Sequence, residues 1–241
     1  MKWRRWIDAA IELLYPSRAN CMGCGSLIGA DEGWLCDACW EWLVPMREIS
    51  DWICPRCGRA LLHDTNCRAC ERWPKDALDG AWIAYAYQRP IDRMIRRLKY
   101  DGVRCLAQWM GTQMAELYLA GGRPSVDVVM AVPMHKRRVR QRGFNHAELL
   151  ARTFAEAAQM PFDQALSRVR HTKQQARLGL QQRESNMRGA FVADDSVKGR
   201  RILLVDDVLT TGTTAIYCAL ALKQAGAKCV YVATLSGVME R

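Results

Sequence analysis

Residues 202–214 read ILLVDDVLTTGTT, and this run constrains the fold more than any other part of the chain. Its first four residues are apolar, which is typical of a short strand buried on both faces, as in a parallel sheet. Asp206 and Asp207 follow where we expect that strand to end. The apolar residues of 215–225 recur at helical spacing. The run therefore predicts strand, loop and helix in succession, the repeating unit of an α/β protein.

The loop of this unit consists of Thr210, Thr211, Gly212, Thr213 and Thr214. It follows the carboxyl end of a strand and precedes a helix, where open α/β sheets bind ligands and where free N–H groups attract phosphate. The two acids would repel phosphate, but they can accept hydrogen bonds from sugar hydroxyls or act through a metal. The run predicts a ribose 5-phosphate site. The alternative, a plain turn with a threonine cap, leaves two adjacent acids at a buried strand end unexplained.

Eight of the eleven cysteines form four C-x-x-C pairs, namely Cys21 and Cys24, Cys36 and Cys39, Cys54 and Cys57, and Cys67 and Cys70. An odd total without a secretory signal argues against a disulfide framework and favours metal binding. Two pairs can surround one Zn²⁺ with four thiolates and leave no open position. We therefore predict two structural zinc sites in a double zinc ribbon over residues 16–79. The short gaps within each half favour sequential pairing, and crossed pairing stays open.

Charge is distributed unevenly along the chain. The net charge is +10, but residues 17–79 carry seven Lys or Arg against ten Asp or Glu, and residues 80–241 carry twenty-five against thirteen. Attraction to nucleic acid depends on cationic contacts and must come mainly from the second part. Trp34, Trp40, Trp42 and Trp52 in the acidic module are expected to pack around the metal sites or against the next domain, with stacking on nucleobases as the alternative.

The chain has no apolar run of about 20 residues, so no membrane span is expected. Residues 1–15 have apolar positions on one helical face, and Pro16 ends the pattern. We expect an amphipathic helix that packs on the protein, or one that docks on a membrane surface or a partner. Asp8 and Glu12 interrupt any signal-peptide core, so a cytoplasmic location is expected.

From residue 80 onward, predicted strands alternate with predicted helices. Strands are expected at 81–87, 126–132, 165–169, 190–192, 201–205 and 229–234, and helices at 90–100, 103–119, 145–159 and 215–225. This pattern predicts an α/β fold over residues 80–241, with a mostly parallel sheet and flanking helices. Residues 74–80 are expected to form the linker from the ribbon module.

Two polar segments are expected near the threonine loop. Residues 136–142 hold five cations in seven residues after a predicted strand, and they could neutralise a pyrophosphate or form a plain surface patch. Residues 171–188 are polar with few apolar anchors, and they could cover the site as a lid or simply connect two elements.

The stretches IRRLKYDG, VPMHKRRVRQRGFNHAELLA, RHTKQQARLGLQQRESNMRGAF and ILLVDDVLTTGTT occur in the order of the ComF family, which includes ComFC and GntX proteins, and with about its spacing. The resemblance spans nearly the whole chain, and the double zinc ribbon fits it. It implies a type I phosphoribosyltransferase domain and a link to DNA uptake during natural competence. His146 departs from the pattern, where we expect Gln.

The resemblance also implies roles for individual residues. Asp206 and Asp207 would face the ribose hydroxyls of phosphoribosyl pyrophosphate bound with Mg²⁺, and they are the candidate catalytic residues. The threonine loop would hold the 5-phosphate. Contacts on the pyrophosphate side would come from Lys136, Arg137, Arg138, Arg142 and Asn145. Lys173 and Gln175 would lie on a flexible loop.

Three hypotheses of function follow. The first is a phosphoribosyltransferase-like protein that binds phosphoribosyl pyrophosphate or a related ribose 5-phosphate ligand; no residue identifies an acceptor, so transfer itself stays open. The second is a non-enzymatic factor that binds single-stranded DNA during uptake, motivated by the basic second domain. The third uses the acidic, tryptophan-rich ribbons to dock proteins of the competence machinery.

Overall fold

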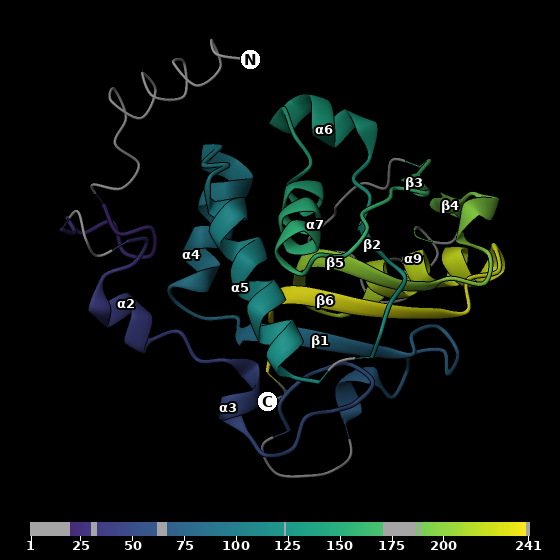
Figure 1. The fold of residues 1–241 in the computed structure, drawn as a ribbon, viewed down its shortest axis with the longest axis horizontal. Coiled ribbons are helices and arrows are strands. Elements are labelled where there is room, and N and C mark those ends of the chain that lie inside the picture. Colours follow the sequence, from purple (N-terminus) through teal and green to yellow (C-terminus); the bar gives the residue numbers. More distant parts are fainter. Residues whose placement is uncertain are drawn as a thin grey trace.

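A parallel four-stranded sheet forms the centre of the molecule, as the alternating pattern predicts (Figure 1). The computed structural model describes residues 20–29, 33–61, 67–122, 124–170, 187 and 189–239. The strands of the sheet are β1 (Gly80–Ala86), β2 (Val128–Ala131), β5 (Arg201–Leu209) and β6 (Cys229–Gly237), in the order β1-β6-β5-β2. All neighbouring strands are parallel. β5 is therefore a central strand, paired along both edges.

Helices cover both faces of this sheet (Figure 1). On one face lie α4 (Ile91–Arg96), α5 (Leu106–Ala120) and α7 (His146–Ala157), which share a core with Leu203 and Val205 of β5. On the other lies α9 (Thr213–Gln224), which shares a core with Ile202 and Leu204. Successive side chains of a strand point to opposite faces. β5 thus divides the interior into an α5–α7 core and an α9 core.

Shorter elements complete the fold. β3 (Leu166–Arg168) and β4 (Phe191–Ala193) form a separate antiparallel pair, whose Leu166 and Phe191 join the α9 core. A π-helical turn, η2 (Arg97–Asp101), continues α4, and η3 (Asp195–Val197) precedes β5. The N-terminal part contains α2 (Asp37–Glu41), α3 (Met46–Ile49) and η1 (Arg68–Cys70).

Two elements near the site differ from what the sequence pattern predicts. β5 does not end at Val205 but continues through both acids to Leu209, because β6 stays paired with it as far as Gly237. The basic run, which lies outside all of the predicted strands and helices, forms the helix α6 (Lys136–Arg142). The ring of His135 caps this helix, since its Nδ1 accepts a hydrogen bond from the backbone N–H of Arg137 at 3.2 Å.

The cysteine pairs close sequentially, and crossed pairing is wrong. One cluster contains Cys21, Cys24, Cys36 and Cys39, and the other contains Cys54, Cys57, Cys67 and Cys70. Within each cluster the four Sγ atoms lie within 4.8 Å of one another. Sγ–Sγ separations of 3.7, 3.6 and 3.4 Å are close to the edge of about 3.8 Å expected for a tetrahedron with Zn–S bonds of about 2.3 Å. Both clusters therefore fit zinc-ribbon sites.

Each ribbon packs into a different core. Cys21, Met22 and Leu35 of the first ribbon join the α5–α7 core, and Cys54, Cys57 and Cys70 of the second join the α9 core. The first ribbon is also held by hydrogen bonds from α4 and η2, since Arg93 donates to the carbonyl of Cys24 and Arg97 donates to that of Met22 at 3.0 Å. The expected linker, 74–80, is packed as well, because Ala77 and Leu78 are buried. The ribbons are thus integral parts of the fold.

The tryptophans of the ribbon module divide into two groups. Trp34 packs against the α5–α7 core, and Trp40 makes an edge contact with Trp109 of α5 at a ring separation of 5.8 Å. Trp42 and Trp52 are 61% and 62% exposed, so the packing expectation is wrong for these two. The amphipathic helix expected at 1–15 lies outside the described residues.

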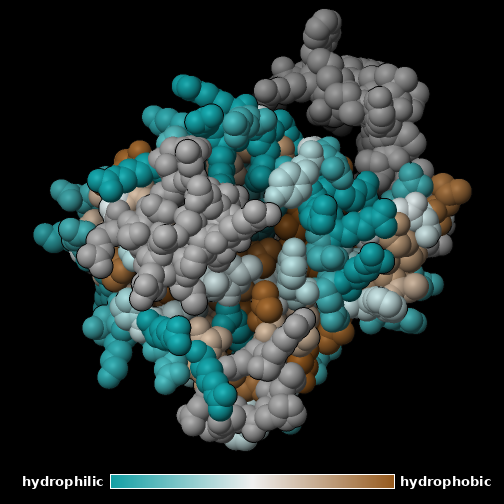
Figure 2. Space-filling model, turned by 180° about the vertical axis from the view of Figure 1, so that it is seen from behind, coloured by the Kyte–Doolittle hydropathy of each residue, from teal (hydrophilic) through white to brown (hydrophobic). Residues whose placement is uncertain are grey.

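No helix in the described part of the chain is both long and apolar enough to cross a bilayer. The face seen in Figure 2 is largely hydrophilic, with smaller hydrophobic areas near its middle.

We expect purified protein to contain two equivalents of zinc per chain and to lose thermal stability when a chelator removes them. Each thiolate cluster organises a ribbon that closes one core, and structural zinc contributes its binding energy to folding. Metal analysis and thermal unfolding monitored by circular dichroism measure both effects. An unchanged melting temperature after complete zinc removal would contradict a structural role.

Candidate functional site

The threonine loop joins β5 to α9 at the carboxyl edge of the sheet. Gly212 is the N-cap of α9 and has a φ of +77°, in the left-handed region that favours glycine. The first N–H groups of α9 have no acceptor within the helix and can bind an anion. The hydroxyls of Thr211 and Thr213 lie 2.8 Å apart, so both are part of the same small surface. A loop of this geometry can bind phosphate, which is the ligand that the sequence analysis expects here.

The second zinc ribbon lies directly against this loop. The guanidinium of Arg59 donates a hydrogen bond to the carbonyl of Thr210, and the indole Nε1–H of Trp73 donates one to the carbonyl of Thr211 at 3.1 Å. A Cβ atom placed on Gly212 would lie 2.1 Å from a carbon of the Trp73 ring. Both donors are buried, with 5% and 7% exposure. Sequence reasoning missed them because their acceptors lie 151 and 138 residues away along the chain.

Asp207 points into the α5–α7 core, where it has two partners. Its carboxylate forms an ion pair with Lys99 of η2 and lies 3.5 Å from Nε2 of His146, at the start of α7. Asp207 is 4% exposed. The sequence contained a signal for Lys99, since it belongs to the IRRLKYDG stretch, but no pattern predicts which acid it meets.

The hydrogen bonds of His146 fix its tautomer. Arg142 Nη1 lies 2.6 Å from Nδ1 of His146, and a guanidinium can only donate. Nδ1 must therefore accept, which leaves the proton on Nε2, facing Asp207. Burial lowers the pKa of His146, which favours the neutral ring. The residue that departs from the family pattern thus links Arg142 to Asp207.

The two acids titrate in opposite directions. Burial raises the pKa of Asp206 to about 8, and the adjacent charge of Asp207 adds to this effect. Burial alone would also raise the pKa of Asp207, but the hydrogen bond from His146 and the charge of Lys99 outweigh it and hold that pKa below its usual value. Asp206 faces the other side of the sheet, where it interacts electrostatically with Arg168 of β3 and Cys218 of α9. The pair therefore holds one firmly ionised and one readily protonated carboxyl.

The residues expected on the pyrophosphate side lie on α6 and at the N-cap of α7, and Arg142 among them interacts electrostatically with Asp207. Lys136 and Arg137 are exposed, and Arg138 interacts electrostatically with both Arg142 and Arg168. Asn145 is the N-cap of α7, and its buried Oδ1 has no hydrogen-bond partner among the described residues. The family resemblance implies that Arg142 contacts the pyrophosphate, but in the structure its guanidinium contacts His146. Lys173 and Gln175 lie outside the described residues.

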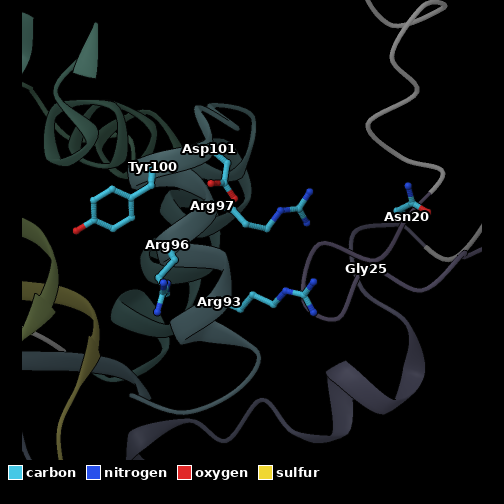
Figure 3. Close-up of a pocket in the computed structure, with 7 residues that line it drawn as sticks. All are labelled: Asn20, Gly25, Arg93, Arg96, Arg97, Tyr100 and Asp101. Carbon is cyan, nitrogen blue, oxygen red and sulfur yellow. The ribbon is translucent and has the colours of Figure 1, made fainter. Parts of the chain in front are cut away.

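A basic hollow lies between the first ribbon and α4–η2. It has a volume of about 440 Å³, and its lining includes Arg93, Arg96, Arg97 and Tyr100. Figure 3 shows Arg93 and Arg97 extending toward the ribbon segment that carries Gly25. Tyr100 borders the hollow and is 72% exposed, but its ring points away from Arg93 and Arg97 (Figure 3). The hollow itself is therefore lined mainly by arginines.

Comparison with known proteins agrees with this architecture. Residues 10–71 match the double zinc ribbon domain, and residues 138–241 match the phosphoribosyl transferase domain. The DNA utilization protein YhgH of Escherichia coli (strain K12) is 30% identical over 186 residues, which cover 75% of this chain and 82% of that protein. Competence protein ComFC of Bacillus subtilis is 25% identical over 222 residues, covering 86% and 89% of the two chains.

Competence protein F of Haemophilus influenzae is 26% identical over 231 residues, covering 88% of this chain and 94% of that protein. These relatives match both the ribbons and the domain with the threonine loop, so the similarity is not confined to one module. With a double zinc ribbon packed on a type I phosphoribosyltransferase-like sheet, this chain belongs to the ComF family.

Proposed function

We propose that the protein binds phosphoribosyl pyrophosphate with Mg²⁺ at the carboxyl edge of β5. The observation that carries this proposal is the combination of charges at this edge of the sheet. An anion-binding loop directly follows two acids, and the acids interact electrostatically with cations, Asp207 with Arg142 and Asp206 with Arg168. Phosphoribosyl pyrophosphate has complementary groups, since its sugar hydroxyls lie between a phosphate at one end and a pyrophosphate at the other.

The acids have separate roles in this proposal. Asp206 has no ion-pair partner among the described residues, and in its ionised form it would accept hydrogen bonds from the ribose hydroxyls or bind the metal. Asp207 already contacts Lys99 and His146, and these contacts would fix the position of the carboxyl end of β5. Single atoms of Asp206, Asp207 and His146 lie within 4.8 Å of one another, and carboxylate oxygens are ligands that suit Mg²⁺. Bound Mg²⁺ would help to neutralise the pyrophosphate.

If transfer occurs, the acceptor is a second substrate that comes from outside the chain. Release of pyrophosphate in the presence of a base or nucleotide would reveal the reaction. Binding of the activated sugar is the function that the geometry supports best.

We further propose a role in DNA uptake, because relatives carry the names competence protein and DNA utilization protein. Direct binding of single-stranded DNA is the second candidate function. Exposed cations on α6, the arginine-lined hollow and the exposed ring of Tyr100 at its border favour it. Single strands bind to proteins through such cations and through stacking on aromatic rings.

Asp206→Asn should weaken binding of phosphoribosyl pyrophosphate about tenfold or more, since a hydrogen bond to a charged group contributes roughly 1.5–3 kcal/mol. Isothermal titration calorimetry in the presence of Mg²⁺ measures the affinity. Asp195→Asn, at an exposed acid of η3, is the matched control and should bind normally. Equal affinity of Asp206→Asn and wild type would remove Asp206 from the site.

The same two acids should affect stability in opposite directions. Asp207→Asn leaves Lys99 without its partner and should lower the free energy of unfolding by about 3 kcal/mol. The folded pKa of Asp206 is raised, so its ionisation lowers wild-type stability increasingly from the unfolded value near 3.8 up to about 8. Asp206→Asn should therefore become more stable relative to wild type as pH rises through this window. Thermal unfolding of both variants at several pH values tests the loss of stability in Asp207→Asn and the gain in Asp206→Asn. A less stable Asp206→Asn across this pH range would refute the raised pKa of Asp206.

Replacing Arg137, Arg138 and Arg140 by Gln should weaken binding of single-stranded DNA. If all three contact phosphates, the slope of log K against log salt should fall in magnitude by about 2. Fluorescence anisotropy with a labelled oligonucleotide gives the affinity and the slope. The control replaces Lys198, Arg200 and Lys228, three cations at the amino ends of β5 and β6, opposite the threonine loop. Equal slopes for the two triple variants would exclude α6 as the DNA contact.

A further inference from the structure

We propose that the second zinc ribbon completes the phosphate site, with Arg59 and Trp73 as positioning residues for the threonine loop and Arg59 as its buried positive charge. This inference rests on the proposed function, in which the loop holds the 5-phosphate of phosphoribosyl pyrophosphate. It assigns part of the ligand site to the ribbon module rather than to the sheet domain alone.

The first argument concerns the direction of the loop's N–H groups. Arg59 and Trp73 bind the carbonyl oxygens of Thr210 and Thr211 from the ribbon side. In a trans peptide unit the C=O and the next N–H point in opposite directions. Holding these two carbonyls therefore directs the N–H groups of Thr211 and Gly212 away from the ribbon, toward the side that a ligand can reach. The two donors set the orientation of the amides that phosphate would use.

The second argument concerns the charge of Arg59. Arg59 is only 5% exposed. Its guanidinium forms no ion pair with any acid in the described part of the chain. Its Nε atom is buried without a hydrogen-bond partner. A buried cation that lacks a counter-charge is unfavourable unless an anion compensates it. A phosphate bound to the N–H groups on the opposite side of the loop would compensate this charge across the peptide unit of Thr210, without touching Arg59.

The third argument concerns the fit between Trp73 and Gly212. The indole ring occupies the space where a Cβ atom of residue 212 would lie, at 2.1 Å from a ring carbon. The indole ring therefore packs directly against the turn at Gly212, and this contact prevents the loop from moving further toward the ribbon. The backbone of Gly212, with its φ of +77°, also disfavours any larger residue.

The ribbon holds both donors firmly. Arg59 follows Cys57 by two residues, and Trp73 follows Cys70 by three, so the second cysteine cluster fixes the backbone at each. Arg56 ties the second segment down, donating to the carbonyls of Cys70 at 2.9 Å and of Trp73 at 2.6 Å. The metal site, the two donors and the loop thus form one continuous set of contacts.

The decisive variants separate charge from packing. Arg59→Gln keeps a donor but removes the charge, and it should weaken binding of phosphoribosyl pyrophosphate and of ribose 5-phosphate about tenfold or more. Arg59→Lys restores the charge and should recover part of that loss. Calorimetry with both ligands measures the effect, after zinc content and circular dichroism establish that each variant is folded. Equal affinities of wild type and Arg59→Gln would overturn the role of the charge while leaving the proposed function intact.

Trp73→Phe keeps an aromatic ring but removes both the Nε1–H donor and part of the indole ring that lies against Gly212. Hydrogen exchange of the amides of residues 210–214 should become faster in this variant without any ligand, and affinity for phosphoribosyl pyrophosphate should fall about three- to tenfold. Trp52→Phe, at an exposed tryptophan of the same ribbon, is the control and should change neither. Unchanged exchange in Trp73→Phe would overturn the positioning role.

Failure of the proposed function gives a different result. Wild-type protein that binds neither phosphoribosyl pyrophosphate nor ribose 5-phosphate would overturn the proposed function, and with it the assignment of Arg59 as a phosphate counter-charge. The exchange measurement on the ligand-free protein would still decide whether Trp73 positions the loop.

Discussion

The arrangement of the molecule depends on β5, a strand paired on both edges whose side chains alternate between two cores. Ile202 and Leu204 belong to the α9 core, and Leu203 and Val205 belong to the α5–α7 core. Each zinc ribbon joins one of these cores. The same alternation continues through the acids, so Asp206 lies on the α9 side of the sheet and Asp207 on the α5–α7 side. The direction of the β5 side chains therefore determines the two cores, the core that each ribbon joins, and the different surroundings of the two acids.

Of the two adjacent acids, Asp206 lowers the free energy of unfolding when it is ionised, whereas Asp207 does not. Asp207 has a cation and an imidazole N–H as partners, and its charge is compensated within the protein. Asp206 lies beside it in a buried setting that favours the protonated form. A group with so strongly shifted a pKa is typical of sites that bind or react with a ligand. In this protein the shift follows from the fold, because β6 keeps β5 in strand conformation past both acids.

The second ribbon changes the usual view of such a module as an appended domain. The ribbon segment carries more acidic than basic residues, yet the side chain that it places against the threonine loop is an arginine. Net charge over a module therefore does not indicate the charge that it contributes to a particular site. The contact also gives the zinc cluster a physical connection to the loop, through Cys57 and Arg59 on one side and Cys70 and Trp73 on the other.

The sequence alone determined the α/β class, the two four-cysteine clusters and the strand–loop–helix unit at 202–214, because each depends on residues close together in the chain. Periodicity, C-x-x-C spacing and the Thr–Gly loop are local patterns. Only the tertiary structure decided that β5 continues through the acids, that Lys99 and His146 hold Asp207, and that Arg59 and Trp73 lie against the loop. These contacts join residues that are distant in sequence, and the physical reason is packing: no local pattern encodes which buried surfaces meet when the ribbons close on the two faces of the sheet.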